Sequence, residues 1–258
     1  MVLSNKESAL LYIYKGDHDM AERELKKWKG DIGFIEAGYY LAQLKYENVN
    51  LFLNFLSNPT KELMGKLDVR RTENFVEMIN CLIDIACHCA REGYQYSGEF
   101  YRYEDARNLN SYKSGVVPSF KSASFDRGGV EIFNKPGKKL LEICPDGFCP
   151  YIPIDKLIQN QLSDEHELLF PPFLDCYVDN GQLRFYVDEN KKVPDVNWPD
   201  LREACYHFAE QYNEDKKRGI ISKKLKKYCK ILYNDLRKKA LSCYKSCMYE
   251  IAEQREYN

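Results

Sequence analysis

The chain lacks several features that mark other classes of protein. None of its apolar runs approaches the roughly 18 residues that a membrane-spanning helix needs. We find neither a Gly-rich phosphate loop nor a Ser-His-Asp arrangement, and no signal peptide is recognised at the N-terminus. These absences argue against a membrane-spanning protein, a P-loop nucleotidase and a serine hydrolase.

The ten cysteines show no spacing of a disulfide framework. Cys81, Cys87, His88 and Cys89 lie close in sequence, but they contain no Cys-x-x-Cys pair. Residues 81, 85 and 89 follow one face of a helix, which favours buried thiols over a metal site. We therefore predict no metal and free thiols in a reducing cytosol, either that of the producing cell or that of a target cell after delivery.

Negative charge is scarce in one segment of a chain whose formal net charge is only −1. Residues 216–239 hold eleven Lys or Arg and a single acidic residue, Asp235, so this segment carries +10 and the remainder −11. An apolar stripe runs through it, formed by Ile221, Leu225, Tyr228, Leu232 and Leu236. This pattern predicts either a packed helix with a solvated outer face or a surface for an acidic partner, nucleic acid or anionic lipid.

The 258 residues divide into three segments by pattern. Residues 1–93 show apolar residues at helical intervals, including a longer helix expected over 71–88, and form a predicted helical lobe. Residues 94–194 hold short β-branched and aromatic runs separated by turns, and we expect six strands between Glu99 and Val187. Residues 195–258 return to helical periodicity as a basic amphipathic tail. The predicted fold class is α+β.

A hairpin is predicted within the sheet segment. Asp179-Asn-Gly181 separates the strand-like runs 174–178 and 182–187. Asn-Gly between such runs favours a two-residue turn because both residues tolerate positive φ.

Three short pieces in fixed order carry the candidate chemistry: Phe100-Tyr-Arg-Tyr103, Phe120-Lys-Ser-Ala-Ser-Phe125, and Glu165-His-Glu167 followed by Leu-Leu-Phe-Pro-Pro. Each reads as a strand. On a regular strand, two glutamates two positions apart emerge on one face, and their mutual repulsion raises the pKa of one unless a cation or donor lies nearby. The alternative is an exposed strand face.

The other two pieces also have two interpretations. Arg102 is either an edge-strand arginine packed on aromatics or a guanidinium whose donors match phosphate oxygens. Ser122 and Ser124 share one strand face, opposite Lys121 and Ala123. Because Phe120 and Phe125 bracket them, they indicate a central strand whose hydroxyls need partners.

Together these motifs resemble the Arg / Ser-x-Ser / Glu-x-Glu mono-ADP-ribosyltransferases, the class of bacterial exoenzyme-like toxins and effectors. The likeness covers roughly residues 94–188, and the strand-like Leu140–Ile143 fits it too. It implies a split β-sandwich that holds NAD in a central cleft, with NAD as substrate. In relatives Glu-x-Glu accompanies arginine acceptors, so it also implies transfer of ADP-ribose to an arginine, on a protein partner.

The resemblance implies a role for each matched residue. Arg102 would bind the NAD phosphates, and Ser122 would hydrogen-bond Glu167 and hold it in place. Glu167 would be the catalytic carboxylate, with Glu165 orienting or deprotonating the acceptor. Ser124 belongs to the same NAD-binding strand, and Phe133 has the spacing of a nicotinamide-stacking aromatic.

The sequence departs from the family pattern in two places. Tyr103 follows the arginine where relatives often have glycine, and residues 156–164 hold no aromatic residue of the kind that often recognises a protein target. The competing hypothesis is a nucleic-acid- or anionic-surface-binding helical protein that acts through residues 216–239.

Overall fold

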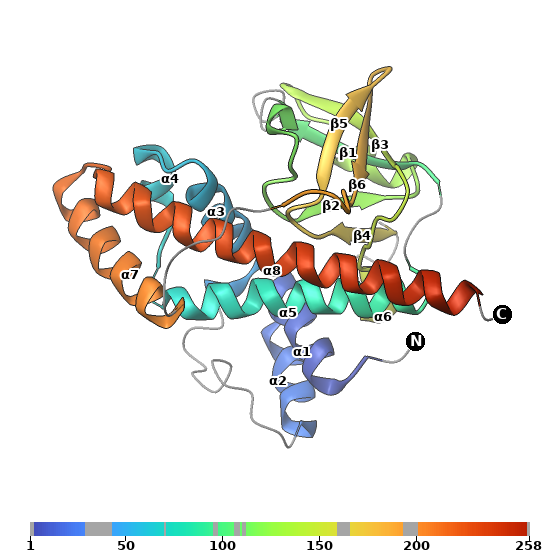
Figure 1. Ribbon diagram of the computed structural model, residues 1–258, viewed down its shortest axis with the longest axis horizontal. Coiled ribbons are helices and arrows are strands. Elements are labelled where there is room, and N and C mark those ends of the chain that lie inside the picture. The colour runs from blue at the N-terminus through green and yellow to red at the C-terminus, as the bar shows by residue number, and fades with distance from the viewer. Residues whose placement is uncertain are drawn as a thin grey trace. The chain divides into compact units, whose positions relative to one another are not determined.

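The computed structural model describes residues 3–28, 43–69, 71–94, 98–105, 109, 112–158, 166–192 and 201–256, and it has a mixed α+β fold (Figure 1). The helices are α1 (Asn5–Lys15), α2 (His18–Lys27), α3 (Tyr46–Ser57), α4 (Lys61–Lys66), α5 (Thr72–Arg91), the 3-10 helix η4 (Gly128–Phe133), α6 (Ile154–Leu157), α7 (Leu201–Arg218) and α8 (Lys223–Glu256). The strands are β1 (Phe100–Asp105), β2 (Lys121–Ser124), β3 (Lys138–Pro145), β4 (Glu167–Phe170), β5 (Asp175–Asp179) and β6 (Gln182–Tyr186).

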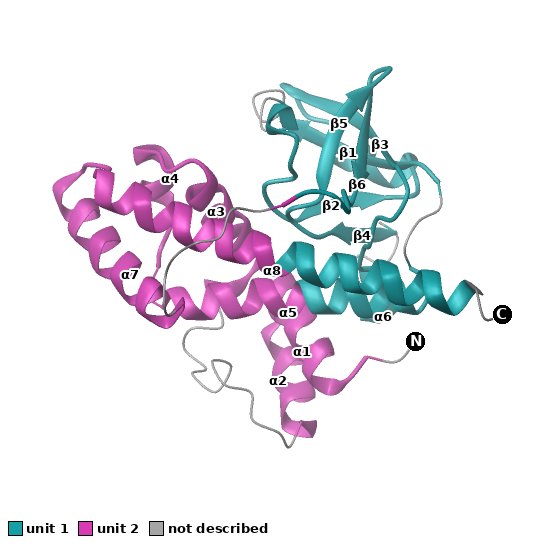
Figure 2. Ribbon diagram, in the orientation of Figure 1, with its two compact units in different colours: residues 1–2, 83–191, 240–258 teal, residues 3–82, 192–239 magenta. Residues whose placement is uncertain are grey.

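The chain forms two compact units, each assembled from separate stretches of sequence (Figure 2). Unit 1 comprises residues 1–2, 83–191 and 240–258, and it contains the sheet with the end of α5 and the end of α8. Unit 2 comprises residues 3–82 and 192–239 and is helical. Both long helices, α5 and α8, therefore contribute residues to both units.

Unit 2 is held by an aromatic core. Phe52 stacks on Phe75 with ring centroids 4.9 Å apart, and Phe208 of α7 meets the Phe52 ring edge-on at 5.8 Å. Tyr212, also on α7, packs edge-on against Phe55 at 5.6 Å. Its hydroxyl donates to the carbonyls of Met64 and Leu67 at the end of α4, so the buried O–H is satisfied.

The apolar stripe of the basic segment packs as an amphipathic helix. In α8, Leu225, Leu232 and Leu236 are fully buried, and Tyr228 stacks on His207 of α7 at 5.8 Å. The lysines between them stay exposed. From Leu225 to Leu236 the structure thus has the predicted packed helix with a solvated basic face, whereas Ile221 lies before α8 and is only half-buried.

The sheet of unit 1 has six strands in the order β4-β2-β1-β3-β6-β5. The pair β1–β3 is the longest ladder, with six antiparallel residue pairs from Phe100↔Ile143 to Asp105↔Lys138. In contrast, β1 pairs with β2 only at Tyr101↔Ser124. The sheet is thus well connected on each side of this junction and weakly connected across it.

The predicted hairpin is confirmed. Strands β5 and β6 pair antiparallel from Asp175↔Tyr186 to Asp179↔Gln182. Asn180 has φ 49° and Gly181 has φ 83°, so both turn residues adopt the left-handed conformation that makes Asn-Gly the preferred pair there.

Buried rings fill the core of unit 1. Phe170 of β4 meets Phe100 of β1 edge-on at 5.3 Å and Phe185 of β6 at 5.2 Å, and all three rings are fully buried. Tyr244 of α8 donates to the carbonyl of Pro172 at 2.8 Å, which fastens the loop after β4 to this helix. In the part of the chain that the structure describes, no helix is long and apolar enough to cross a membrane.

Candidate functional site

The three predicted motifs lie on neighbouring strands. Arg102 is in β1, Ser122 and Ser124 are in β2 and Glu167 begins β4, and these strands are adjacent in the order β4-β2-β1. Segments that are far apart in sequence are therefore brought to one region of the sheet.

Glu167 is held from two sides. Ser122 Oγ donates to Glu167 Oε1 at 2.9 Å, and Glu167 is only 9 % exposed. The backbone N–H of Glu167 donates to Asp155 Oδ2 on the short helix α6. Both contacts fix the start of β4, so the carboxylate has a defined position. Sequence reasoning missed Asp155, because no local pattern links it to a strand twelve residues later.

Arg102 lies where β1 and β2 separate. Leu169 of β4 lies opposite Ser122 in register, but its backbone N–H and C=O both bond to Ile152 and so face away from Ser122. The Ser122 backbone groups correspondingly face away from β4. The Ser122 carbonyl therefore points toward β1, and Arg102 Nη1 donates to it. If β1 and β2 stayed paired here, a backbone N–H of β1 would donate to the Ser122 carbonyl. Because the two strands have already diverged, the Arg102 guanidinium donates to it instead.

The Arg102 guanidinium belongs to a buried charge cluster. Its Nη2 lies 2.9 Å from Glu104 Oε2, and the same oxygen lies 3.7 Å from Lys121 Nζ and accepts from the Tyr112 hydroxyl at 3.2 Å. Arg102 Nε is buried without a hydrogen-bond partner among the described residues. The Glu104 carboxylate thus forms ion pairs with both Arg102 and Lys121. Glu104 escaped the sequence analysis, although its i+2 spacing from Arg102 on a strand was a usable signal.

Burial and charge shift the pKa values in this cluster. Burial, and after it the nearby Arg102 charge, lower the pKa of Lys121 to about 8, while Glu104 opposes both effects. Burial likewise raises the pKa of the Tyr112 hydroxyl. The Lys121 ammonium is consequently poised to lose its proton within a mildly alkaline range.

Arg102 and Glu167 contact different parts of Ser122. Because Tyr101 pairs with Ser124, strand alternation places Arg102 on the face of Lys121 and Ala123, opposite the face of the serines and Glu167. The guanidinium binds the Ser122 carbonyl, whereas the carboxylate binds the Ser122 hydroxyl. Ser122 therefore links the two charged groups at the separation of β1 and β2.

Ser124 and Phe133 have other surroundings. Ser124 lies opposite Glu167 in register and is 1 % exposed, but its hydroxyl accepts from the Asp126 N–H at 3.0 Å and so shapes the turn after β2. Phe133 ends η4 and is 39 % exposed. Tyr103 of β1 donates to Glu131 of η4 at 3.1 Å, which attaches this helix to the strand that carries Arg102.

Glu165 lies outside the described residues. The placement of Glu165 and Glu167 on one strand face therefore stays a prediction; the described part of β4 begins at Glu167. His166 has φ 47°, a left-handed conformation that breaks strand alternation just before Glu167.

Within the described ranges, no three His, Cys, Asp or Glu side chains are grouped so as to hold a metal ion. Comparison of the chain with models of protein families, with curated proteins and with solved structures gives no match.

Removing the Ser122 hydroxyl should lower turnover more than it lowers stability. The hydrogen bond to a charged carboxylate contributes about 1.5–3 kcal/mol. If the chain has the NAD-cleaving activity that the motif resemblance implies, Ser122→Ala should reduce its kcat by tenfold or more with little change in KM. Ser122→Thr, which keeps the hydroxyl, should recover activity. Ser124→Ala is the matched control, because its hydroxyl contacts the Asp126 turn instead; equal kcat losses in the two alanine variants would contradict a positioning role for Ser122.

The buried Lys121 should make stability rise with pH. Between about pH 8 and the ordinary lysine value of 10.5, the unfolded chain keeps a proton that the folded chain has lost. Since the unfolded state binds more protons there, the free energy of unfolding should increase by up to about 1.4 kcal/mol per pH unit. Urea unfolding from pH 7.5 to 9.5 measures this slope, and Lys121→Met should lack it. Parallel slopes for the two proteins would show that Lys121 keeps its charge.

Proposed function

We propose that this chain is an arginine-directed mono-ADP-ribosyltransferase, which cleaves NAD, releases nicotinamide and transfers ADP-ribose to an arginine of a protein. The observation that supports this most is the 2.9 Å hydrogen bond from Ser122 Oγ to Glu167 Oε1. The motif resemblance implied this contact from residues that lie 45 positions apart. The strands of the second and third motifs are neighbours in the sheet, and this hydrogen bond also joins the motifs through their side chains.

A fixed carboxylate suits the chemistry of NAD cleavage. Breaking the bond between ribose and nicotinamide develops positive charge on the ribose, in an oxocarbenium-like transition state. Glu167, accepting from the ribose 2′-hydroxyl, would stabilise that charge more than it stabilises the ground state. Because Ser122 and Asp155 already position Glu167, little reorganisation is needed when the charge develops.

Arg102 is the proposed phosphate ligand. Its guanidinium has five N–H donors, and Nε lacks a partner among the described residues. In the present arrangement Glu104 occupies Nη2, so a diphosphate would have to share or displace that carboxylate. Lys121 is close to Glu104 and would then balance its charge. Because Arg102 and Glu167 lie on opposite faces, NAD would have to pass through the separation of β1 and β2 to reach both, next to Ser122, which contacts each of them.

The weak β1–β2 junction supports the proposed split β-sandwich. A single residue pair, Tyr101↔Ser124, connects β4-β2 to β1-β3-β6-β5. A fold that holds its substrate between two parts of a sheet requires such a division.

Glu165, through the resemblance alone, would activate the acceptor arginine, whose pKa above about 12 makes it a poor nucleophile without a proton acceptor.

Labelled NAD tests this proposal. The purified chain, NAD carrying a labelled adenylate and a cell lysate should yield a labelled protein whose tryptic peptides bear ADP-ribose on arginine. NAD labelled on nicotinamide should yield free nicotinamide but no labelled protein. ADP-ribose attached to asparagine or cysteine would refute the arginine specificity and leave the reaction class intact.

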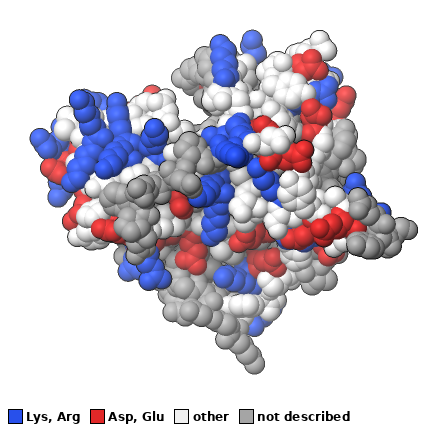
Figure 3. Space-filling view, in the orientation of Figure 1, with Lys and Arg blue, Asp and Glu red and all other residues white. Residues whose placement is uncertain are grey.

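A second candidate function rests on the exposed basic face of unit 2. Lysines and arginines gather over the turn between α7 and α8 (Figure 3). On α8 the residues Lys223, Lys226 and Lys230 recur every three or four positions and are exposed, while Asp235, the one acidic residue of 216–239, is half-buried. Because the apolar stripe of α8 is buried in the protein, it is not available to insert into a lipid surface. This favours electrostatic binding of an acidic partner.

Reversing charge on this face should slow target modification without affecting NAD cleavage. Glutamates at Lys223, Lys224, Lys226 and Lys227 spare the buried stripe and suit the N-terminus of α8. If the face steers an acidic target, the modification rate should fall about tenfold or more at low salt and converge with wild type at high salt. A folded variant that modifies its target at the wild-type rate in low salt would show that the segment is scaffolding. Steep salt-dependent RNA binding without NAD turnover would favour the nucleic-acid alternative instead.

A further inference from the structure

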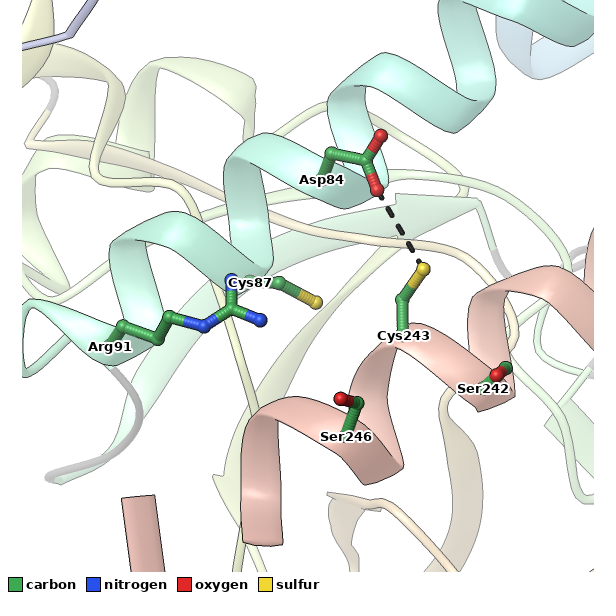
Figure 4. A pocket seen from close by; sticks show the side chains of 6 residues that line it. All are labelled: Asp84, Cys87, Arg91, Ser242, Cys243 and Ser246. Atoms are coloured by element: carbon green, nitrogen blue, oxygen red, sulfur yellow. Dashed lines mark hydrogen bonds between the residues drawn. The ribbon is translucent and has the colours of Figure 1, made fainter. Parts of the chain in front are cut away.

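A second cluster of reactive side chains occurs in unit 1, between the end of α5 and the end of α8. Here a pocket of about 690 Å³, its open mouth included, is lined by Asp84, Cys87, Arg91, Ser242, Cys243 and Ser246 (Figure 4). None of these residues belongs to β1, β2 or β4, so the proposed NAD chemistry does not use the pocket.

Two cysteines from different helices meet beside this pocket. Cys247 Sγ of α8 donates to the backbone carbonyl of Cys87 of α5 at 3.3 Å. Cys87 is 2 % exposed and lines the pocket, whereas Cys247 is fully buried. A disulfide needs a sulfur–sulfur distance near about 2.05 Å, so the two thiols must turn toward each other from this contact to form it.

The surroundings shift the pKa values of the two thiols in opposite directions. Hydrogen bonding from Cys87 lowers the pKa of Cys247; burial opposes this, and the positive charge of Arg91 adds to it. The same hydrogen bond and burial raise the pKa of Cys87. The Arg91 guanidinium extends toward Cys87 in Figure 4, and its Nε is paired with Glu250 at 2.6 Å. The shift of Cys247 is toward the thiolate, the form that attacks a peroxide, and Cys87 supplies the second thiol that disulfide formation requires.

The third cysteine of the pocket is held differently. Cys243 Sγ donates to Asp84 Oδ1 at 3.6 Å, as the dashed line in Figure 4 marks. Cys243 is thus a natural control for Cys87 and Cys247, since it lines the same pocket as Cys87 but bonds to a different partner.

We propose that Cys87 and Cys247 form a reversible dithiol pair that a peroxide, arriving through this pocket, oxidises to a disulfide linking α5 to α8. The thiolate of the pair attacks one oxygen of hydrogen peroxide, the O–O bond breaks, and the departing hydroxide takes a proton to become water. The other sulfur then attacks the resulting sulfenic sulfur and expels its hydroxyl as a second water. The two thiols lose two electrons and two protons, and one peroxide becomes two waters.

The test is a disulfide map of the full-length chain after exposure to hydrogen peroxide. Digestion without reductant should yield one cross-linked product, containing Cys87 and Cys247 and lighter by two hydrogens than the separate peptides, and dithiothreitol should reverse it. The pair should be oxidised at least tenfold faster than Cys149, a fully buried thiol whose pKa burial raises. Cys243→Ser should form the same disulfide at the wild-type rate, whereas Cys87→Ser and Cys247→Ser should not form it.

A disulfide to Cys243, or oxidation of Cys243 while Cys87 and Cys247 stay reduced, would overturn the proposal. So would retention of both thiols at peroxide concentrations that oxidise free cysteine. The wild-type map decides this even if a serine variant fails to fold. Because the readout is a covalent mass and not NAD turnover, its result is independent of the proposed function.

Discussion

Glu167→Gln should abolish both hydrolysis of NAD and transfer of ADP-ribose while leaving the protein folded. Glutamine keeps the shape of the side chain and can still accept from Ser122 Oγ, but it lacks the negative charge that meets the developing charge on the ribose. Removing one such electrostatic partner reduces kcat by about 10²–10³, or roughly 2.7–4 kcal/mol. Steady-state release of nicotinamide, with circular dichroism to verify folding, measures the effect.

Glu165→Gln is the matched control for this substitution, because it removes a carboxylate two positions away. We expect it to lose arginine transfer and to retain part of the NAD hydrolysis, since only Glu167 is assigned to the ribose. Equal and mild losses in the two variants would show that the two roles are assigned wrongly.

Arg102→Lys should weaken NAD binding far more than it weakens the fold. Lysine retains the positive charge beside Glu104 but lacks the planar fork of donors that binds a phosphate and the Ser122 carbonyl together. Charge-assisted hydrogen bonds contribute about 1.5–3 kcal/mol each, so NAD affinity should fall roughly 10- to 100-fold. Isothermal calorimetry measures the affinity, and thermal unfolding measures the stability.

Arg184→Lys serves as the control, because Arg184 lies on β6 and bonds to Gln182 and Asp179. It should leave NAD affinity unchanged. If Arg102→Lys binds NAD as wild type does, or if its melting temperature collapses, then Arg102 is a structural residue of the buried charge cluster.

Local patterns predicted the secondary structure of both units well. The apolar spacing of residues 71–88 predicted α5, and Asn180-Gly181 predicted the hairpin because the turn chemistry is contained in two residues. The stripe of the basic segment predicted the buried face of α8. In each case the physical cause lies within one element.

Apart from the β5–β6 hairpin, whose turn lies in two adjacent residues, contacts between elements were predictable only where the motif resemblance supplied them. The bond from Ser122 to Glu167 was expected on that ground. The cluster of Glu104, Lys121 and Arg102 was not, because it depends on how β1 separates from β2. The left-handed conformation of His166 also escaped prediction, since nothing in Glu-His-Glu disfavours a continuing strand. The discontinuous units depend on long-range packing that periodicity does not encode.

Nicotinamide release from NAD by the wild-type chain, measured beside Glu167→Gln in the same preparation, tests the central claim most directly. A small guanidino compound such as agmatine supplies the acceptor and makes the assay independent of the natural target. The account predicts release by the wild type at a rate at least about 10²-fold above the variant, with agmatine converted to its ADP-ribosyl adduct. Wild-type release no faster than that of Glu167→Gln would contradict it.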